Sequence, residues 1–347
     1  MRDDFVTIDG SKGEGGGQML RTSLSLSAIT GRPLRIVNIR AKRNKPGLKR
    51  QHLTCVRAVA EICDAKYSAV DVGSMELDFE PGKIKGGVYR FDVGTAGSVT
   101  LVAQCVLPVL LKADKPSVVA ITGGTHVPYA PIWEFFTDCY LPELRRMGAR
   151  VEAELECPGF YPAAGGVVKL RVWPMEKAAD GYALDNLGEY RGGEAVGVVS
   201  ALPEDIAEAE AGIVCRQFRN LGLKSVVRKV ESFGPGNYCY VKLNYERASV
   251  VISSVGTYDK SRKAVANEVV QSAREFLKSG AACEKHLADQ LLVPAAVLLG
   301  ERNYTWHFDD LEFKDWRVAV QKETLHFSTN QEVIKEFAMA ECPYDRG

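Results

Sequence analysis

Motifs that mark membrane, zinc-binding and disulfide-rich proteins are missing from this sequence. No apolar run reaches the ~18 residues that a membrane-spanning helix needs, and the first residues, "MRDDFVTIDG", lack the basic and then apolar pattern of a signal peptide. The nine cysteines include no CxxC pair, and the five histidines form neither HxxxH nor HExxH. We therefore expect a globular, cytoplasmic protein with reduced thiols and no membrane partner.

Standard nucleotide-binding fingerprints are also missing, although the first residues are rich in glycine. The stretch "GSKGEGGGQMLR" at 10–21 begins with the glycine spacing of a Walker loop, but Gly16 and Gly17 stand where Lys and Ser or Thr are required, and GxGxxG fits no better. Its glycines still permit close approach of the backbone to a ligand. Glu14 would repel a bare phosphate unless a divalent cation lay between them. A phosphate cradle and a structural turn both remain open from this stretch alone.

Acidic residues are absent between Arg32 and Arg57, where nine basic residues occur. Residues 1–57 hold twelve Lys or Arg against four Asp or Glu, a net charge of +8, although the whole chain is neutral with 44 of each kind. Such a run fits either a solvated surface or a site for a polyanion. The composition alone leaves both interpretations open.

The basic stretch "IRAKRNKPGLKRQHL" at 39–53 predicts a strand, a turn at Pro46-Gly47 and then a helix. In a strand, Arg40 and Lys42 would share one face and Arg43 would lie on the other. Arginine suits phosphate because its planar fork makes paired hydrogen bonds. No aromatic residue interleaves with these cations, so a terminal phosphate is favoured here over a long nucleic-acid strand.

A pattern of strand, turn, helix and strand occurs three times, at 6–39, 89–121 and 124–156. It predicts tandem α+β units whose sheets are covered on one face by helices. The pattern is interrupted by a region with strand-like and helix-like pieces of its own. We therefore expect a large discontinuous domain, 1–183 and 281–347, with a small domain inserted at 184–280.

Several polar residues in apolar surroundings are candidates for a site. Asp289 and Gln290 lie in "HLADQLLVP", and Gln104 lies in "LVAQCVLPVLL", where a polar side chain usually has a specific partner. His326 lies in "KETLHFSTNQEVIKEF", before a segment typical of a helix. Taken alone, a histidine in the position of His326 is more often structural than nucleophilic.

Seven ordered stretches together resemble the RNA 3′-terminal phosphate cyclases, over nearly the whole chain. They are "DGSKGEGGGQMLRTSLSLSAITG", "IRAKRNKPGLKRQHLT", "VGTAGSVTLVAQCVLP", "GGTHVPYAP", "GFYPAAGGV", "HLADQLLVP" and "HFSTNQEVIKEF". The resemblance implies a large domain of repeated units, each a four-stranded sheet with two helices, related in architecture to the enolpyruvyl transferases. It also implies that the inserted domain is a thioredoxin-like α/β domain.

The resemblance further implies an ATP-dependent reaction in three steps. A histidine attacks the α-phosphate of ATP and releases pyrophosphate, the AMP passes to an RNA 3′-phosphate, and the 2′-hydroxyl closes a 2′,3′-cyclic phosphate and releases AMP. Carried onto this sequence, the nucleophile is His326. The partner is an RNA with a 3′-phosphate end, and the cofactor is Mg²⁺ or Mn²⁺. The oligomeric state stays open, with a homodimer as one candidate.

The matching motifs also assign the remaining site residues. Glu14 is implied as a ligand of the divalent metal, with Gln104 nearby. The residues implied to bind phosphates of ATP or of the RNA end are Arg21, Arg40, Arg43 and Gln51. Those implied to bind the rest of the nucleotide are Gln104, Pro131, His286, Asp289 and Gln290, with Pro131 and His286 flanking adenine.

Two other functions compete with this interpretation. A noncatalytic relative could serve ribosome assembly as an RNA- or protein-binding factor, but such relatives lack the histidine that His326 matches. An enolpyruvyl transferase is weakly supported, because shared architecture does not fix function.

Overall fold

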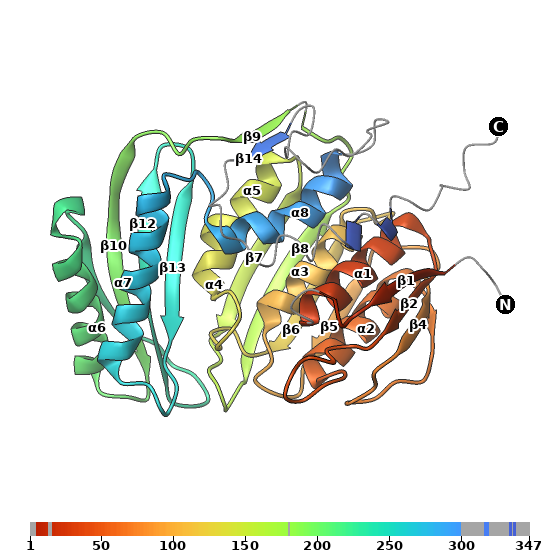
Figure 1. Ribbon diagram of the computed structural model, residues 1–347, viewed down its shortest axis with the longest axis horizontal. Coiled ribbons are helices and arrows are strands. Elements are labelled where there is room, and N and C mark those ends of the chain that lie inside the picture. Colours follow the sequence, from red (N-terminus) through yellow and green to blue (C-terminus); the bar gives the residue numbers. More distant parts are fainter. Residues whose placement is uncertain are drawn as a thin grey trace.

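In the computed structural model the chain is described at residues 5–12, 16–179, 181–299, 316–318, 333–334 and 336–337. These residues form a mixed α+β fold with several small sheets and helices packed against them (Figure 1). The predicted α+β class is confirmed at this level. Among the described residues, no helix is both long and apolar enough to cross a membrane.

The first sheet has four strands in the order β1-β2-β4-β3, and only its β1–β2 pair is parallel. The strands are β1 (Val6–Asp9), β2 (Leu34–Val37), β3 (Lys66–Tyr67) and β4 (Leu77–Glu80). Its helices are α1 (Gly17–Thr30) and α2 (Arg50–Cys63). Alternate residues of β1, β2 and β4 are buried, as expected for a sheet with one covered face.

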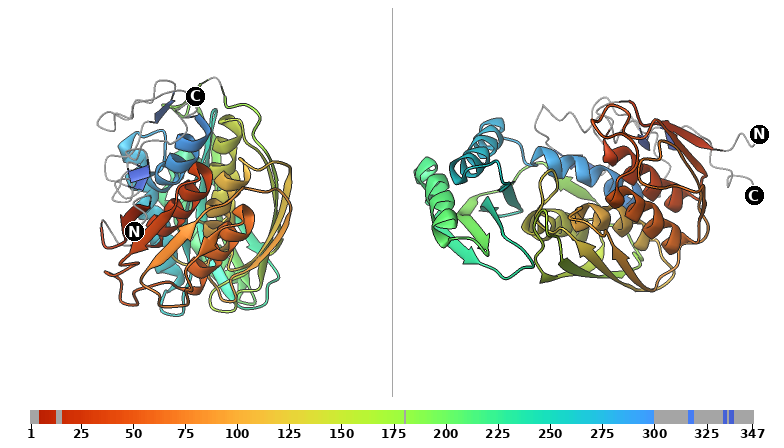
Figure 2. Two further views of the ribbon diagram at one scale, coloured as in Figure 1. Left: turned by 90° about the vertical axis from the view of Figure 1, so that its right-hand side faces the viewer. Right: turned by 90° about the horizontal axis from the view of Figure 1, so that it is seen from below.

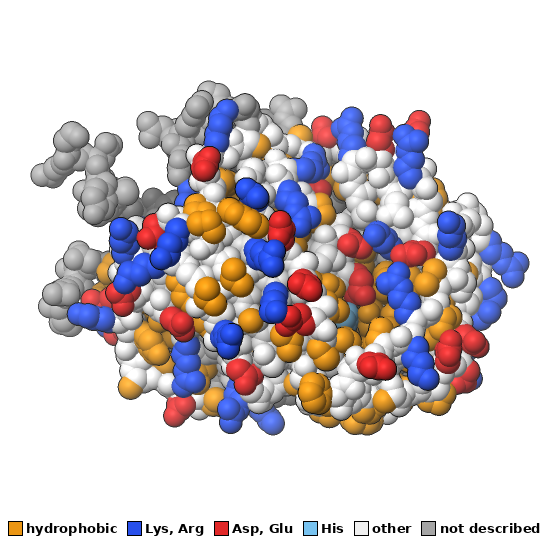
Figure 3. Space-filling view, turned by 180° about the vertical axis from the view of Figure 1, so that it is seen from behind, with side chains coloured by type: hydrophobic (Ala, Val, Ile, Leu, Met, Phe, Trp, Pro, Cys, Tyr) orange, Lys and Arg blue, Asp and Glu red, His pale blue; other side chains and the backbone are white. Residues whose placement is uncertain are grey.

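The second sheet repeats this arrangement in the order β5-β6-β8-β7, again with one parallel pair, β5–β6. The strands are β5 (Val88–Asp92), β6 (Ser117–Gly123), β7 (Arg150–Cys157) and β8 (Gly166–Trp173). The helical segments are α3 (Val99–Leu110), α4 (Trp133–Phe135), a π-helical turn η1 (Phe136–Tyr140) and α5 (Leu141–Arg146). Seen from behind, the molecule presents interspersed basic and acidic side chains (Figure 3).

The third predicted copy, 124–156, does not form a unit of its own. Its helical part is α4, η1 and α5, and its strand, β7, pairs with β8 in the second sheet. Residues 124–156 are therefore part of the second half of one unit, and residues 89–121 form the first half of the same unit. Periodicity alone cannot separate these cases, because each unit contains the helix-then-strand step twice.

A third sheet follows, in the order β11-β10-β12-β13. Its strands are β10 (Tyr190–Ser200), β11 (Lys224–Lys229), β12 (Gly236–Tyr245) and β13 (Ser249–Val255). Its helical segments are α6 (Glu204–Gln217), a 3₁₀ turn η2 (Arg219–Leu221) and α7 (Arg262–Ser279). Helices α6 and α7 lie on the outer side of this sheet (Figure 2, right). The bounds 184–280 for an inserted domain stay a prediction.

The two faces of the third sheet pack against different partners. Ala195, Val241 and Leu243 belong to a separate core with residues of α6 and α7. Val196 and Tyr240 belong instead to the main core, which also contains residues of α4 and η1. The third sheet is therefore joined to the first two by apolar packing.

The remaining elements connect these layers. Helix α8 (Lys285–Leu299) packs against α1 and α3. Strand β9 (Tyr182–Leu184) pairs in parallel with β14 (Trp316–Val318). Helix α3 touches α1, α2, α8 and the second sheet, which explains why its sequence is apolar on nearly every side.

Candidate functional site

The starts of α1 and α2 lie so close together that one of them requires glycine. A Cβ atom on Gly17 would lie 2.1 Å from Nε2 of His52, and one on Gly16 would lie 3.3 Å from a guanidinium nitrogen of Arg43. The first turn of a helix has backbone N–H groups without intrahelical partners. The start of α1 therefore offers amides beside an imidazole and a guanidinium, which suits an anion.

His52 is buried and neutral at this junction. Burial lowers the pKa of His52 to about 3, and the positive charges of Arg21, Arg40 and Lys49 act in the same direction. The backbone N–H of Lys49 donates to Nδ1 of His52 at 3.1 Å. The neutral ring therefore carries its proton on Nε2, which faces Gly17. No sequence motif assigned a role to His52, and its basic neighbours were the one signal that could have found it.

The prediction of a strand around Arg40 is wrong. Strand β2 ends at Val37, residues 38–45 form turns and bends, and Arg40 has a positive φ of 53°. One guanidinium nitrogen of Arg40 donates to the carbonyl oxygens of Lys45 and Gly47, each at 2.7 Å. The loop thus folds around a buried cation that satisfies its carbonyl groups, a tertiary contact that strand periodicity does not register.

Gln51 and Pro131 are both held against the first turn of α3. The backbone N–H of Ser98 donates to Oε1 of Gln51 at 2.7 Å, and Oγ of Ser98 caps α3 by accepting from the backbone N–H of Leu101 at 3.2 Å. The hydroxyl of Thr100 donates to the carbonyl oxygen of Pro131 at 2.8 Å. The starts of α2 and α3 and the loop after β6 therefore meet at one place.

Helix α8 brings two of the predicted residues to the same region. The side-chain amide of Gln104, on α3, donates to Oε1 of Gln290. Asp289 is buried, and its charge acts on the guanidinium of Arg21. Arg21 also donates to Oε1 of Gln18 one turn earlier on α1. Contacts among α1, α3 and α8 thus assemble four of the residues that the motifs assigned.

His286 lies at the start of α8 with an exposed side chain. The preceding carboxylate, Glu284, accepts the backbone N–H groups of His286 at 2.9 Å and Leu287 at 3.2 Å. Burial raises the pKa of Glu284 to about 7, against these two hydrogen bonds. Glu284 therefore caps the start of α8. This cap also fixes the backbone position from which the side chain of His286 extends.

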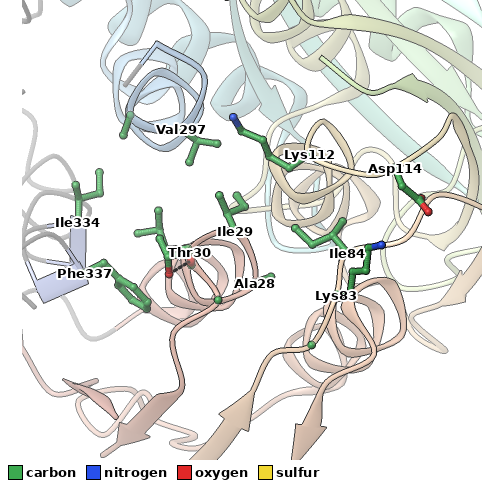
Figure 4. A pocket seen from close by; sticks show the side chains of 14 residues that line it. Ala28, Ile29, Thr30, Lys83, Ile84, Lys112, Asp114, Val297, Ile334 and Phe337 are labelled. Carbon is green, nitrogen blue, oxygen red and sulfur yellow. Dashed lines mark hydrogen bonds between the residues drawn. The ribbon is translucent and has the colours of Figure 1, made fainter. Parts of the chain in front are cut away.

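Glu14 and His326 lie outside the described residues. The turn that follows His326 is described in part, and Val333, Ile334 and Phe337 are buried there. A guanidinium nitrogen of Arg32 donates to the carbonyl oxygen of Phe337 at 2.5 Å. Ile334 and Phe337 line one side of a cavity of about 660 Å³, whose other walls are α1, α8 and the segments that follow β4 and α3 (Figure 4). The described part of this turn is therefore docked at the end of α1 far from Gly17.

Within the described ranges, no three His, Cys, Asp or Glu side chains gather in a way that could hold a metal ion. Gln104 is described and Glu14 is not, so the implied metal pair stays a prediction.

Comparison with known proteins decides the family. A profile described as RNA 3′-terminal phosphate cyclase matches residues 12–343. This chain belongs to the RNA 3′-terminal phosphate cyclase family. The resemblance that the seven stretches predicted is confirmed.

Curated cyclases from bacteria are similar along almost their whole length. The chain is 42% identical to the RNA 3′-terminal phosphate cyclase of Ectopseudomonas mendocina, over 98% of this chain and 95% of that protein. It is 45% identical to the enzyme of that name from Pseudomonas fluorescens, over 86% and 87% of the two chains. The cyclase of Koribacter versatilis is 40% identical over 96% and 90%. The similarity to cyclases therefore extends through both the first two sheets and the third.

Proposed function

We propose that this cyclase-family protein uses ATP to convert an RNA 3′-phosphate into a 2′,3′-cyclic phosphate in the cytoplasm. The observation that carries the proposal is the junction of α1, α2 and α8. There Arg21 lies near the neutral His52 and the buried Asp289, beside the first amides of α1. Cationic and N–H donors held together in this way suit a phosphate chain.

The proposed reaction has three displacements at phosphorus. A ring nitrogen of His326 attacks the α-phosphorus of ATP, and pyrophosphate leaves. An oxygen of the RNA 3′-phosphate then attacks the phosphorus of the histidine-bound AMP, and His326 leaves as neutral imidazole. Finally the 2′-oxygen attacks the RNA phosphorus, its proton passes to solvent or a base, and AMP leaves. The covalent step turns one difficult displacement into easier ones.

The proposed roles of the described residues follow from their contacts. Arg21 and Arg43 lie at the start of α1, where they would bind phosphates and offset charge that develops during displacement. Gln51 is fixed by Ser98 beside them. Arg40 holds the loop that carries Arg43 by hydrogen bonds to its carbonyl groups. We therefore assign Arg40 a structural role in addition to its proposed phosphate contact.

Glu14 and Gln104 would hold Mg²⁺ or Mn²⁺. Their side chains supply oxygen donors, which hard divalent cations prefer. The amide nitrogen of Gln104 donates to Oε1 of Gln290, and this hydrogen bond holds the side chain of Gln104 in place. When bound, the cation would neutralise charge on the phosphates of ATP.

The finer architecture is part of the same proposal. The strand order β11-β10-β12-β13, with a parallel pair joined by α6 and a hairpin followed by α7, supports a thioredoxin-like arrangement for the inserted domain. The two successive four-stranded sheets support repeated units of the enolpyruvyl-transferase type.

Label transfer tests the function. Incubation with ATP labelled at the α-phosphate and Mg²⁺ or Mn²⁺ should label the protein, and His326→Ala should abolish the label. His307→Ala is a matched control, which should label like the wild type. Equal labelling of His326→Ala would disprove the assigned nucleophile. A wild-type protein that takes no label and leaves RNA 3′-phosphates unchanged would favour the noncatalytic RNA- or protein-binding factor instead.

A further inference from the structure

The loop between β6 and α4, residues 124–132, exposes one aromatic side chain at its tip. Tyr129 is fully exposed, at 104% of the reference area, whereas the other residues of this loop are buried or half-buried. Its φ is +62°, in the left-handed region that residues with a Cβ rarely adopt. Folding therefore gains nothing from this ring, and glycine or asparagine would fit the backbone better.

A buried network fixes the amino-terminal side of this loop. Oγ1 of Thr125 lies 2.7 Å from Nδ1 of His126, and Nε2 of His126 lies 3.0 Å from a carboxylate oxygen of Glu134. The hydroxyl of Tyr238, on β12, donates to the other oxygen of Glu134 at 2.7 Å, and its ring stacks on His126 with centroids 4.2 Å apart. The third sheet thus braces the loop that carries Tyr129.

The other side of the loop is fixed to the proposed nucleotide site. Thr100 donates to the carbonyl oxygen of Pro131, and Ile132 is buried. The same first turn of α3 holds Gln51 through Ser98. With both sides fixed, the ring of Tyr129 is presented in place, so a ligand that meets it loses little loop entropy.

We propose that Tyr129 is a stacking platform for a nucleobase at the 3′ end of the RNA substrate. This inference rests on the proposed function. Single-stranded RNA ends offer unstacked bases, which tyrosine rings bind by stacking. The RNA phosphate must meet the activated AMP, so the terminal nucleotides lie beside the nucleotide site. Since Pro131 and His286 are assigned to adenine, the exposed ring two residues earlier is available to the RNA.

The test compares KM values for the two substrates. We expect Tyr129→Ala to raise KM for a short 3′-phosphorylated RNA about tenfold, which lies within the usual effect of losing one stacked base. KM for ATP and the rate of self-adenylation should not change. Tyr129→Phe keeps the ring and should behave like the wild type.

Two further variants separate stacking from backbone effects. Tyr129→Gly removes the ring but suits a positive φ, so it should lose RNA affinity as Tyr129→Ala does. Tyr258, in a turn after β13, is also exposed, at 84%, and Tyr258→Ala should leave both KM values unchanged. An unchanged KM for RNA in Tyr129→Ala would overturn the proposal, and so would a loss confined to ATP. Failure of the wild type to form an adenylate would instead count against the proposed function.

Discussion

At the residue scale, Glu210 of α6 shows how one buried carboxyl group shapes stability. Its Oε1 accepts a hydrogen bond from the side-chain amide of Asn237 at 2.6 Å, whereas its Oε2 is buried without a partner among the described residues. Burial raises the pKa of Glu210 to about 8. The folded protein therefore keeps a proton on Glu210 at neutral pH, which an unfolded chain releases near its ordinary value of 4.5.

Because the pKa of Glu210 is higher in the folded protein than in the unfolded chain, the free energy of unfolding falls as the pH rises. Below pH 4.5 both states are protonated and nothing is lost, but between pH 4.5 and 8 the free energy of unfolding falls by about 1 kcal/mol per pH unit. Glu210→Gln removes this loss, so its stability advantage over the wild type should grow from pH 5 to pH 8 in urea unfolding. Glu208 is an exposed neighbour on the same helix, and the stability difference between Glu208→Gln and the wild type should not change with pH. A constant difference between Glu210→Gln and the wild type across this range would contradict the assignment.

Single residues also show where sequence reasoning stops. The motifs pointed to Arg21, Gln104 and Asp289, and contacts among three helices bring them to one region. The buried roles of His52 and Arg40 were not predicted. Each depends on groups brought by folding, such as the backbone of Gly17 and the loop carbonyl groups, which no spacing rule records.

At the scale of elements, the helices and hairpin strands were the more predictable parts. Within 184–280, the pieces of sequence typical of a helix coincide with α6 and α7, and pieces typical of a strand coincide with β12 and β13. Strand β11 was missed, because "KSVVRK" is short and mostly exposed. The predicted strand at 39–43 failed because the Arg40 contacts override the local pattern.

The docked turn at Val333–Phe337 gives a prediction about an element. Val333 lies seven positions after His326, so the chain from one to the other spans at most about 25 Å. Helix α1 has 14 residues and is therefore about 21 Å long. A tether of this length just allows His326, the proposed nucleophile, to reach the start of α1. We therefore expect the position of the docked turn to control adenylation.

Phe337→Leu should slow self-adenylation about tenfold by loosening this docked turn, since a smaller side chain leaves a gap in the cavity wall. Closure of an RNA already carrying 3′-adenylate should stay near the wild-type rate, because the proposed closure step does not use His326. Phe276→Leu makes the same change in the core beside α7 and should leave adenylation unchanged. Equal slowing of both reactions by Phe337→Leu would indicate general structural damage.

At the scale of the whole molecule, the charge distribution matters more than the net charge. The chain is neutral, yet its first 57 residues carry a net charge of +8. Lys45, Lys49 and Arg50 are exposed near the start of α2. Partial desolvation and the nearby charges of Arg40, Lys45 and Arg43 lower the pKa of Lys49, although its side chain is largely exposed, and these cations therefore lie close together. One terminal phosphate cannot contact them all, so neighbouring phosphates of the RNA should also be bound.

This gathering of cations predicts a salt dependence that varies with RNA length. For a 20-nucleotide RNA with a 3′-phosphate, Lys45→Ala with Lys49→Ala should weaken binding and reduce the slope of log K against log salt by about 1.4, since each phosphate contact to a single strand contributes about 0.7. A 3′-phosphorylated dinucleotide has few phosphates and should be little affected. The matched pair Lys224→Ala with Lys229→Ala, on exposed residues of β11, removes the same charge from another surface and should leave the slope unchanged. Equal slopes for all three proteins would mean that the basic loop is a solvated surface, the other interpretation that its composition left open.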